Sequence, residues 1–518
     1  MAKRRSGATP LITAAEAFPL LERRAASAER EVSLLFRVFD TRMTLRDEAA
    51  RDLARAEGGG EDWAGLLVAV ARKGVKVRLQ VSDFDPIGGA ALHREAWASL
   101  RHLSARAASA GGGLPIEAMA ARHPAGLGLF WRRLFAARAR RELKRIHAQE
   151  EDAFATHPSL RGAAEASPPR LFPVTHHQKV AVVDGAFALV GGLDFDERRW
   201  DTPDHDRPAA ETWRDVTLAV DGPAVAGVAH AGAAIWSDAS ADWAERDDRA
   251  ALPSLAEPRV WRAEPEGEPD PLLAVVMTRS VPAGGAFAFA PRRTDGETER
   301  AVLGLIWSAR RFLYIETQFI RCRRVVDALT AAARAEPRLE LVLVLPFAPE
   351  AYAFEGRRDT ATRHGEALQL RTLRRLRAAF GERAAILSPA KPARRKKADD
   401  FVAHGAGAVY VHSKVLIADG VAALIGSANL NGRSLRWDTE VSLVWRDEAE
   451  VGAFQARLAE SWLGEPHGPP DRAATWREAA TLNASKPPDL RKGFLLPHDM
   501  KRPARFGRIF PLLPDDLF

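Results

Sequence analysis

The segment His177-Gln-Lys-Val-Ala-Val-Val-Asp184 occurs a second time in this chain, as His412-Ser-Lys-Val-Leu-Ile-Ala-Asp419. Both copies read His-x-Lys, then four residues, then Asp. The agreement continues downstream without a gap, and the matched pairs are Gly185 with Gly420, Gly191 with Gly426, Asp194 with Asn429, Asp196 with Asn431, and Arg198 with Arg433. A common register held between segments so far apart indicates an internal duplication.

Each copy has the pattern of two short strands joined by a tight turn. The apolar run Val180–Val183 predicts a buried strand, and strand alternation places His177 and Lys179 on the same side of the chain. Gly185 supplies the turn, and residues 187–190 predict the second strand. The second copy repeats this pattern, so each half offers an imidazole, an ammonium and an amide or carboxyl group at neighbouring strand ends.

If the two halves pack face to face, the pocket between them suits a phosphoryl group. Cations and N–H donors hold the oxygens, one histidine can attack, and the other can protonate the leaving oxygen. Glycine after the second strand lets the backbone approach a ligand, so Gly192 and the equivalent Ser427 are expected in the substrate-binding site. The expected catalytic side chains are His177, Lys179, His412 and Lys414.

The duplicated motif resembles that of the phospholipase D superfamily, whose mark is a repeated H-x-K-x4-D. Residues 199–205 (RWDTPDH) and 213–216 (WRDV) resemble the phospholipase D and cardiolipin synthase branch. The resemblance extends from about Val32 to about Leu463, and residues 312–319 resemble the strand that opens the family's second half. It implies an α/β fold in which two similar α-β-α sandwich halves pack as one pseudo-twofold catalytic body.

The resemblance also implies the roles of the site residues. His177 would be the nucleophile that forms a phosphohistidine, and His412 the general acid and then the base. Lys179 and Lys414 would hold the phosphate oxygens with help from Asn429. No cofactor and no catalytic metal are implied. Asp194 stands where an Asn is common in the superfamily, and a carboxylate there would repel phosphate unless it is paired.

Four acidic residues accompany the two motifs. A catalytic histidine needs a partner on its far nitrogen; Glu440 matches the family's acidic partner position, and Asp215 is the candidate in the first half. Which carboxylate serves which histidine stays open at this point. Asp184 and Asp419 are expected to be structural, as salt-bridge residues, and not to take part in the chemistry.

The length of 518 residues and the duplication predict two units, 1–255 with the first motif and 256–518 with the second motif and an extended tail. Residues 249–295, rich in Pro, Glu and Gly, are expected to cross between the halves. The net charge of +7 suits an anionic substrate or surface without choosing between nucleic acid and lipid. The single cysteine, Cys322, excludes an intramolecular disulfide.

Two basic segments have alternative interpretations. Residues 128–151 predict a helix with seven basic residues between Arg132 and Arg145. We expect the solvated face of a packed helix; the alternative is a membrane-surface helix, because cations with aromatics suit anionic lipid interfaces. Residues 392–397 contain four consecutive cations, for which we expect a solvated loop, with a headgroup contact as the alternative.

These observations favour a phospholipase D that hydrolyses the distal phosphodiester of glycerophospholipids to phosphatidic acid, with headgroup exchange to an alcohol. The alternatives are a cardiolipin-synthase-type phosphatidyltransferase and a phosphodiesterase acting on nucleic acid, which would need a longer basic groove with aromatics. The expected partners are a phospholipid substrate and a peripheral membrane surface, without nucleic acid, and the expected state is a monomer.

The chain also carries expectations about its location. No signal-peptide pattern follows the basic residues 3–5, and no apolar run approaches about 18 residues, so we expect no transmembrane helix. We expect a cytoplasmic or peripheral membrane protein, and export without a signal peptide stays open. The predicted catalytic strands begin near residue 32, which leaves no room for a calcium-binding lipid module, so calcium dependence is not expected.

Overall fold

Each copy of the repeated segment forms a β-hairpin in the middle of its own sheet. In the first copy β5 (Val180–Val183) pairs antiparallel with β6 (Phe187–Gly191), and in the second β15 (Val415–Ala418) pairs with β16 (Ala422–Gly426). The structure, a computed structural model, describes residues 7–149, 158–246, 251–263, 270–397, 401–464, 468–511 and 513–518.

The first sheet has the strand order β1-β7-β6-β5-β2-β3-β4 in the described residues. Strands β2, β3 and β4 are parallel, and the others run antiparallel to their neighbours. The further strands are β1 (Ala8–Ile12), β2 (Glu31–Phe36), β3 (Lys76–Ser82), β4 (Ile116–Ala121) and β7 (Val216–Asp221). The helices of this part are α1 (Ala14–Ala26), α2 (Glu48–Gly58), α3 (Trp63–Arg72), α4 (Ala90–Ser109), α5 (Leu129–Gln149), α7 (Pro158–Glu165) and α8 (Ala224–Ala244).

The second sheet repeats this order and adds a strand at each edge: β18-β12-β11-β10-β15-β16-β17-β8-β9. Its further strands are β8 (Leu273–Val281), β9 (Arg292–Gly296), β10 (Phe312–Glu316), β11 (Glu340–Val344), β12 (Ala384–Pro389), β17 (Glu440–Trp445) and β18 (Leu495–Pro497). A separate small sheet pairs β13 (Val402–Ala403) with β14 (Ala406–Gly407). The helices are α9 (Glu297–Ser308), α10 (Arg323–Ala335), α11 (Glu350–Ala353), α12 (Thr360–Phe380), α13 (Gly432–Arg436), α14 (Glu448–Leu463), α15 (Ala473–Ala484) and α16 (Lys501–Phe506).

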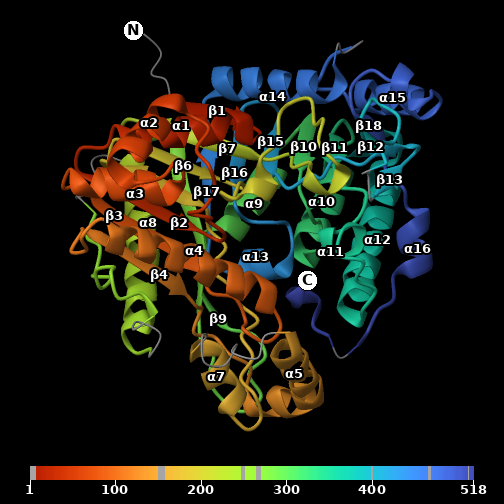
Figure 1. Ribbon diagram of the computed structural model, residues 1–518. Coiled ribbons are helices and arrows are strands. Elements are labelled where there is room, and N and C mark those ends of the chain that lie inside the picture. Colours follow the sequence, from red (N-terminus) through yellow and green to blue (C-terminus); the bar gives the residue numbers. More distant parts are fainter. Residues whose placement is uncertain are drawn as a thin grey trace.

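Strand alternation divides the core into an inner and an outer part. On β10, Phe312 and Tyr314 belong to the large core that also contains the strands of the first sheet. Leu313 and Ile315 point to the other face and pack under α9, α10 and α12. Figure 1 shows the resulting arrangement, with α1–α3 on the outside of the first sheet and α10 and α12 on the far side of the second. The predicted α/β fold of two similar halves is confirmed, and the domain boundary near residue 255 stays a prediction.

The structure corrects two predictions about connecting segments. Residues 249–295 do not merely cross between the halves, because β8 and β9 lie within them and extend the second sheet. The tail is not an extended strap: it forms α15, β18 and α16, and β18 pairs with β12. The tail's prolines flank α15 instead of interrupting it, and such positions are compatible with a helix. The predicted helix over 128–151 is confirmed as α5 (Leu129–Gln149), and residues 150–151 lie outside the described residues.

Strand β4 was not predicted at all. Its sequence, Ile-Glu-Ala-Met-Ala-Ala, is poor in β-branched and aromatic residues, yet every residue of it is buried beside β3. Tertiary packing therefore overrides its weak strand propensity. None of the helices in the described ranges combines the length and apolar character needed to cross a bilayer.

The motif aspartates hold the start of β2 in the first sheet and of β10 in the second, each the strand that pairs with the motif hairpin. Asp184 accepts hydrogen bonds from the backbone amides of residues 29, 30 and 31, at 2.7–2.9 Å. Asp419 accepts three equivalent bonds from residues 310, 311 and 312, each 2.8 Å long. Both aspartates have a positive φ, 54° and 53°, in the turn of the hairpin. Their role is structural, as expected, but backbone amides take the place of the expected salt bridge.

We therefore expect Asp184→Ala and Asp419→Ala to destabilise the protein by about 2 kcal/mol each, because three strand donors lose a charged acceptor. The melting temperature, measured by differential scanning fluorimetry, should fall for both variants. Asp52→Ala, which removes an exposed helix carboxylate paired with Arg55, is the control and should change it little. Unchanged melting of the two motif variants would contradict the structural role.

Candidate active site

The two motifs lie next to each other because backbone hydrogen bonds join each motif to the other half. The His177 backbone amide donates to Thr439 O at 2.9 Å, and the His412 amide donates to Arg214 O at 2.8 Å. Each contact joins the residue at the start of one motif to the residue just before a carboxylate of the other half. The backbone itself thus fixes the relative position of the two histidines.

Asp215 and Glu440 occupy equivalent positions in the two halves. Thr217 is opposite Gly191 in the first sheet, and Ser442 is opposite Gly426 in the second, so both carboxylates lie two residues before the matched partner. The structure answers the question that the sequence left open, because the pairing is crosswise. His177 Nδ1 lies 3.0 Å from Glu440 Oε2, and His412 Nδ1 lies 2.7 Å from Asp215 Oδ2.

This pairing prepares both imidazoles for chemistry at their other nitrogen. A carboxylate at Nδ1 fixes the tautomer with the proton on Nδ1, which leaves Nε2 as a lone-pair nitrogen. Burial, reinforced by neighbouring cations, lowers the pKa of His177 and of His412 well below the ordinary value. Burial also raises the pKa of Glu440 to about 7 and that of Asp215 to about 6.

The two lysines lie against the same histidines. Lys179 Nζ donates to His177 O at 2.7 Å, and Lys414 Nζ donates to the His412 carbonyl and lies 2.9 Å from His412 Nδ1. Burial lowers the pKa of Lys179, and it lowers that of Lys414 to about 7, although Asp215 opposes this second shift. The structure therefore brings the four predicted motif side chains and both predicted carboxylates into one buried cluster.

Asp194 is paired, as a carboxylate near phosphate must be. It is fully buried, its Oδ1 accepts the Val38 amide at 2.9 Å, and Lys179 Nζ lies 3.7 Å away. Arg37 Nη1 approaches the other carboxylate oxygen at 3.9 Å. Asn429, its counterpart, donates to Gln318 Oε1 at 3.3 Å, and its own side-chain oxygen has no protein partner in the described residues.

Gly192 and Ser427 lie against the two carboxylates that hold the histidines, and their expected part in substrate binding stays a prediction. A side chain at Gly192 would place its Cβ 2.3 Å from Asp215 Oδ1, so this glycine makes room for the carboxylate. The Ser427 hydroxyl donates to Glu440 and accepts the Val441 amide at 3.1 Å. Both residues lie behind a carboxylate that holds a histidine, and we place them among the positioning residues.

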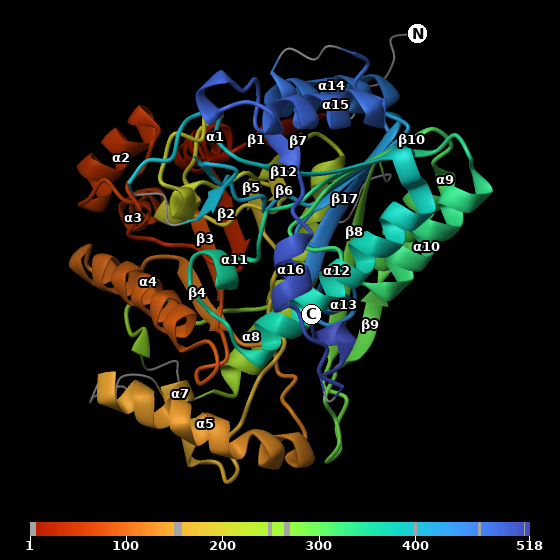
Figure 2. The same cartoon turned by 90° about the vertical axis from the view of Figure 1, so that its right-hand side faces the viewer.

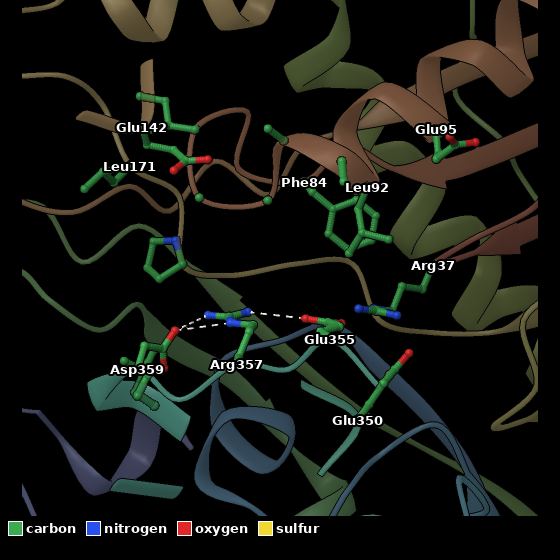
Figure 3. Close-up of a pocket in the computed structure, with 18 of the residues that line it drawn as sticks. Arg37, Phe84, Leu92, Glu95, Glu142, Leu171, Glu350, Glu355, Arg357 and Asp359 are labelled. Atoms are coloured by element: carbon green, nitrogen blue, oxygen red, sulfur yellow. Dashed lines mark hydrogen bonds and ion pairs between the residues drawn. The ribbon is translucent and has the colours of Figure 1, made fainter. Parts of the chain in front are cut away.

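A cavity of about 1510 Å³ opens beside this cluster. Seven arginines and eight carboxylates line it, and many are paired with one another. Figure 3 shows Arg357 between Asp359 and Glu355, with Phe84 and Leu92 across the pocket. Further apolar lining residues come from α5, from the segment between α7 and β5, and from the C-terminal segment; they include Leu134, Phe135, Leu171, Leu517 and Phe518.

Two arginines of the cavity wall connect it to the motif residues, and neither was singled out as a site residue from the sequence. Arg37 contacts Asp194, which in turn adjoins Lys179. Arg199 lies 4.0 Å above the ring of Trp213, whose centroid is 4.7 Å from that of His412. Trp213 belongs to the buried core, and its position two residues before Asp215 brings its ring to His412.

The cluster has the composition of an oxyanion site and not of a metal site. The cations lower each other's proton affinity, since Lys414 and Lys179 contribute to the lowered pKa of His412. An anion between the lysines would offset that repulsion. In the described residues no group of three or more His, Cys, Asp or Glu side chains has an arrangement suited to holding a metal ion.

Comparisons with known proteins agree with this chemistry. Residues 302–462 match a family described as "Cardiolipin synthase, PLD-like domain". Phospholipase D1 of Mus musculus is 30% identical over 178 residues, 29% of this chain and 16% of the mouse protein. Phospholipase D2 of Bos taurus is 25% identical over 362 residues, 52% of this chain and 38% of the bovine protein. The matches thus span less than half the length of these curated relatives.

One solved structure covers most of the chain. The crystal structure of phosphatidylserine synthase from Haemophilus influenzae Rd KW20 superposes with a TM-score of 0.50 at 13% identity. The superposition covers 89% of this chain and 86% of that one. At this identity the likeness concerns the fold alone.

We expect sulfate, a tetrahedral oxyanion that does not titrate near neutral pH, to bind this cluster with net uptake of protons. Added negative charge raises the pKa of every group here, and Lys414, with a pKa of about 7, is mostly neutral at pH 8 before binding. Calorimetry in two buffers of different ionisation enthalpy measures the uptake. Affinity should fall above pH 7, by up to about tenfold per pH unit for each proton taken up.

Lys414→Gln should weaken sulfate binding and reduce this proton uptake, whereas Lys486→Gln, at a partly exposed lysine of the tail, should change neither. Equal binding heats in both buffers would contradict the electrostatic description of the cluster.

Proposed function

The chain belongs to the phospholipase D superfamily, and on this basis we propose that it hydrolyses the distal phosphodiester of glycerophospholipids to phosphatidic acid. The observation that carries the proposal is the crosswise pairing of His177 with Glu440 and of His412 with Asp215. Two oriented imidazoles beside two lysines supply a nucleophile, an acid and cationic contacts for one phosphodiester.

In the first step His177 Nε2 attacks phosphorus, and the bond from phosphorus to the headgroup oxygen breaks. The leaving oxygen takes a proton from Nε2 of His412. The anionic substrate raises the pKa of His412 by offsetting Lys179 and Lys414, which favours the protonated imidazolium that this step needs. Glu440 accepts from Nδ1 of His177 and stabilises the positive charge that forms on the phosphorylated ring.

In the second step the now neutral His412 takes a proton from water, and the water oxygen attacks phosphorus. The phosphorus–nitrogen bond breaks, which releases phosphatidic acid and restores His177. An alcohol can replace water and gives the exchanged phospholipid instead. His177 as the nucleophile follows the family resemblance, and its side chain is 11% exposed against 4% for His412, which supports its role in meeting the substrate.

The cavity beside the site supports a lipid substrate over a nucleic acid. A nucleic-acid strand needs a groove with excess positive charge, whereas seven arginines here face eight carboxylates. Apolar side chains such as Phe84, Leu134 and Phe518 suit acyl chains. Both motifs lie in one chain, so we propose a monomer that reaches its substrate from a membrane surface.

A phosphatidyltransferase of the cardiolipin-synthase type is the second candidate. The family description that matches residues 302–462 favours it. It would use the same phosphohistidine, with the hydroxyl of a second lipid in place of water. The product distribution distinguishes the two activities.

The proposed activity predicts products that can be separated by chromatography. Mixed phospholipid vesicles should yield phosphatidic acid, which gives way to phosphatidylethanol when ethanol is added, because both acceptors attack the same intermediate. Lipid–lipid transfer products without phosphatidic acid would favour the second candidate. Plasmid DNA is incubated in parallel, and nicked DNA with untouched lipid would overturn the lipid assignment.

Substitution of the two histidines should have different effects on nitrophenol release from bis(p-nitrophenyl) phosphate, whose leaving group needs no protonation. His412→Ala should release about one equivalent of nitrophenol and stall with a mass increase at residue 177, while steady turnover falls by roughly a thousandfold. His177→Ala should release none. His230→Ala, at a partly exposed histidine of α8, is the control and should turn over normally. A burst from His177→Ala would reverse the two roles.

A further inference from the structure

We propose that α5 and the loop between β8 and β9 form a surface that docks the protein on an anionic phospholipid bilayer. This inference rests on the proposed lipid function and deepens it by naming the membrane partner. The surface, called the docking face below, consists of Phe130, Arg133, Arg140, Arg141 and Lys144 of α5 with Phe287 of the loop. Figures 1 and 2 both show α5, with α7 beside it, projecting from one end of the molecule.

The aromatic end of the docking face is held rigidly although it is exposed. Phe287 is 75% exposed and Phe130 is 46% exposed, and their ring centroids lie 5.4 Å apart. The loop is tied to the first turn of α5 by bonds from Phe130 N to Ala286 O and from Trp131 Nε1 to Phe287 O, each 2.9 Å. Fixed aromatic rings at an exposed tip cost free energy in water and suit the headgroup region of a bilayer.

The loop and the helix approach so closely that only glycine fits between them. A Cβ on Gly128 would lie 2.5 Å from Ala286 O, and the Gly128 amide donates to Ala288 O at 2.7 Å. The two aromatic residues therefore belong to one built surface and not to two independent loops.

The cations of α5 are divided between two sides of the helix. Arg138 lies 4.0 Å from Asp359 and Arg145 pairs with Glu142, and all four residues line the cavity. Arg132 donates to the carbonyl oxygens of Pro168 and Pro169. The other four cations, at positions 133, 140, 141 and 144, follow Phe130 at helical spacing on the outer side and are exposed. Within the ranges that the structure describes, no carboxylate pairs with these four, and an anionic partner would offset their mutual repulsion.

The docking face and the cavity share α5. Leu134 and Phe135, between the two sets of cations, line the cavity. On its remaining side the helix is anchored, because Ala139 and Ile146 pack with Leu160 and Ala163 of α7. A bilayer bound to the outer side of α5 thus lies next to the cavity wall, which gives a lipid a short route toward His177.

Vesicle binding tests the docking face without any turnover. Sedimentation with phosphatidylglycerol–phosphatidylcholine vesicles is measured in a His177→Asn background, so that the lipid is not consumed. Phe287→Ser should weaken binding about tenfold and Arg133→Gln/Arg141→Gln about thirtyfold. The matched controls, Trp307→Ser on α9, 49% exposed, and Arg374→Gln/Arg377→Gln on α12, should bind like the parent.

The same four changes, made with His177 intact, should leave hydrolysis of soluble bis(p-nitrophenyl) phosphate within about twofold, since none of these residues lines the cavity. Docking variants that bind vesicles like their controls would overturn the proposal. The proposal would also be overturned if the protein bound a single-stranded oligonucleotide but no vesicles, and the same variants lost the oligonucleotide binding. Anionic vesicle binding without phosphatidic acid production would leave the docking face standing and overturn the proposed function alone.

Discussion

The structure depends on one constraint, namely that each histidine is held by a carboxylate from the other half. Glu440 serves His177 and Asp215 serves His412, while backbone bonds at residues 439 and 214 fix the same crossing. Both halves are therefore needed to orient either imidazole. Separating or rotating the halves would leave buried carboxylates and imidazoles without partners, which is far costlier than losing an exposed pair. Duplication in one chain ensures that the two halves are always present together.

Burial of the two histidine–carboxylate pairs and the two lysines sets the protonation of the whole cluster. The pKa values of both histidines and both lysines are lowered, while Asp215 and Glu440 have raised pKa values, so each shift favours the neutral form. An oxyanion placed among these groups would raise the pKa values of the histidines and lysines and so favour their charged forms. In the proposed mechanism substrate binding and protonation of the general acid are therefore coupled, because the same negative charge favours both.

Much of this could be predicted from sequence because the duplication repeats local patterns. The hairpins, the shared face of His177 and Lys179 and the structural role of Asp184 follow from strand alternation and a turn glycine. The crosswise pairing could not be predicted, since it depends on how the halves pack. The longer segment between His177 and Asp215 also hides the equivalence of Asp215 with Glu440. Gly192 was predicted to approach the ligand, because a sequence shows that a glycine allows a close contact but not which group makes it. In the structure that group is the Asp215 carboxylate.

The two halves differ chemically where their tasks must differ. A symmetric site would give both histidines the same basicity, whereas the proposed mechanism assigns attack on phosphorus to one and proton exchange to the other. Asp194 lies 3.7 Å from Lys179 and 3.9 Å from Arg37, whereas Asn429 donates to Gln318 and its side-chain oxygen has no hydrogen-bond partner in the described structure. A carboxamide can present its NH2 group to a phosphate oxygen without repelling it. The Asp-to-Asn difference between the copies therefore places a carboxylate beside Lys179 and Arg37 in one half and a neutral carboxamide at the equivalent position of the other.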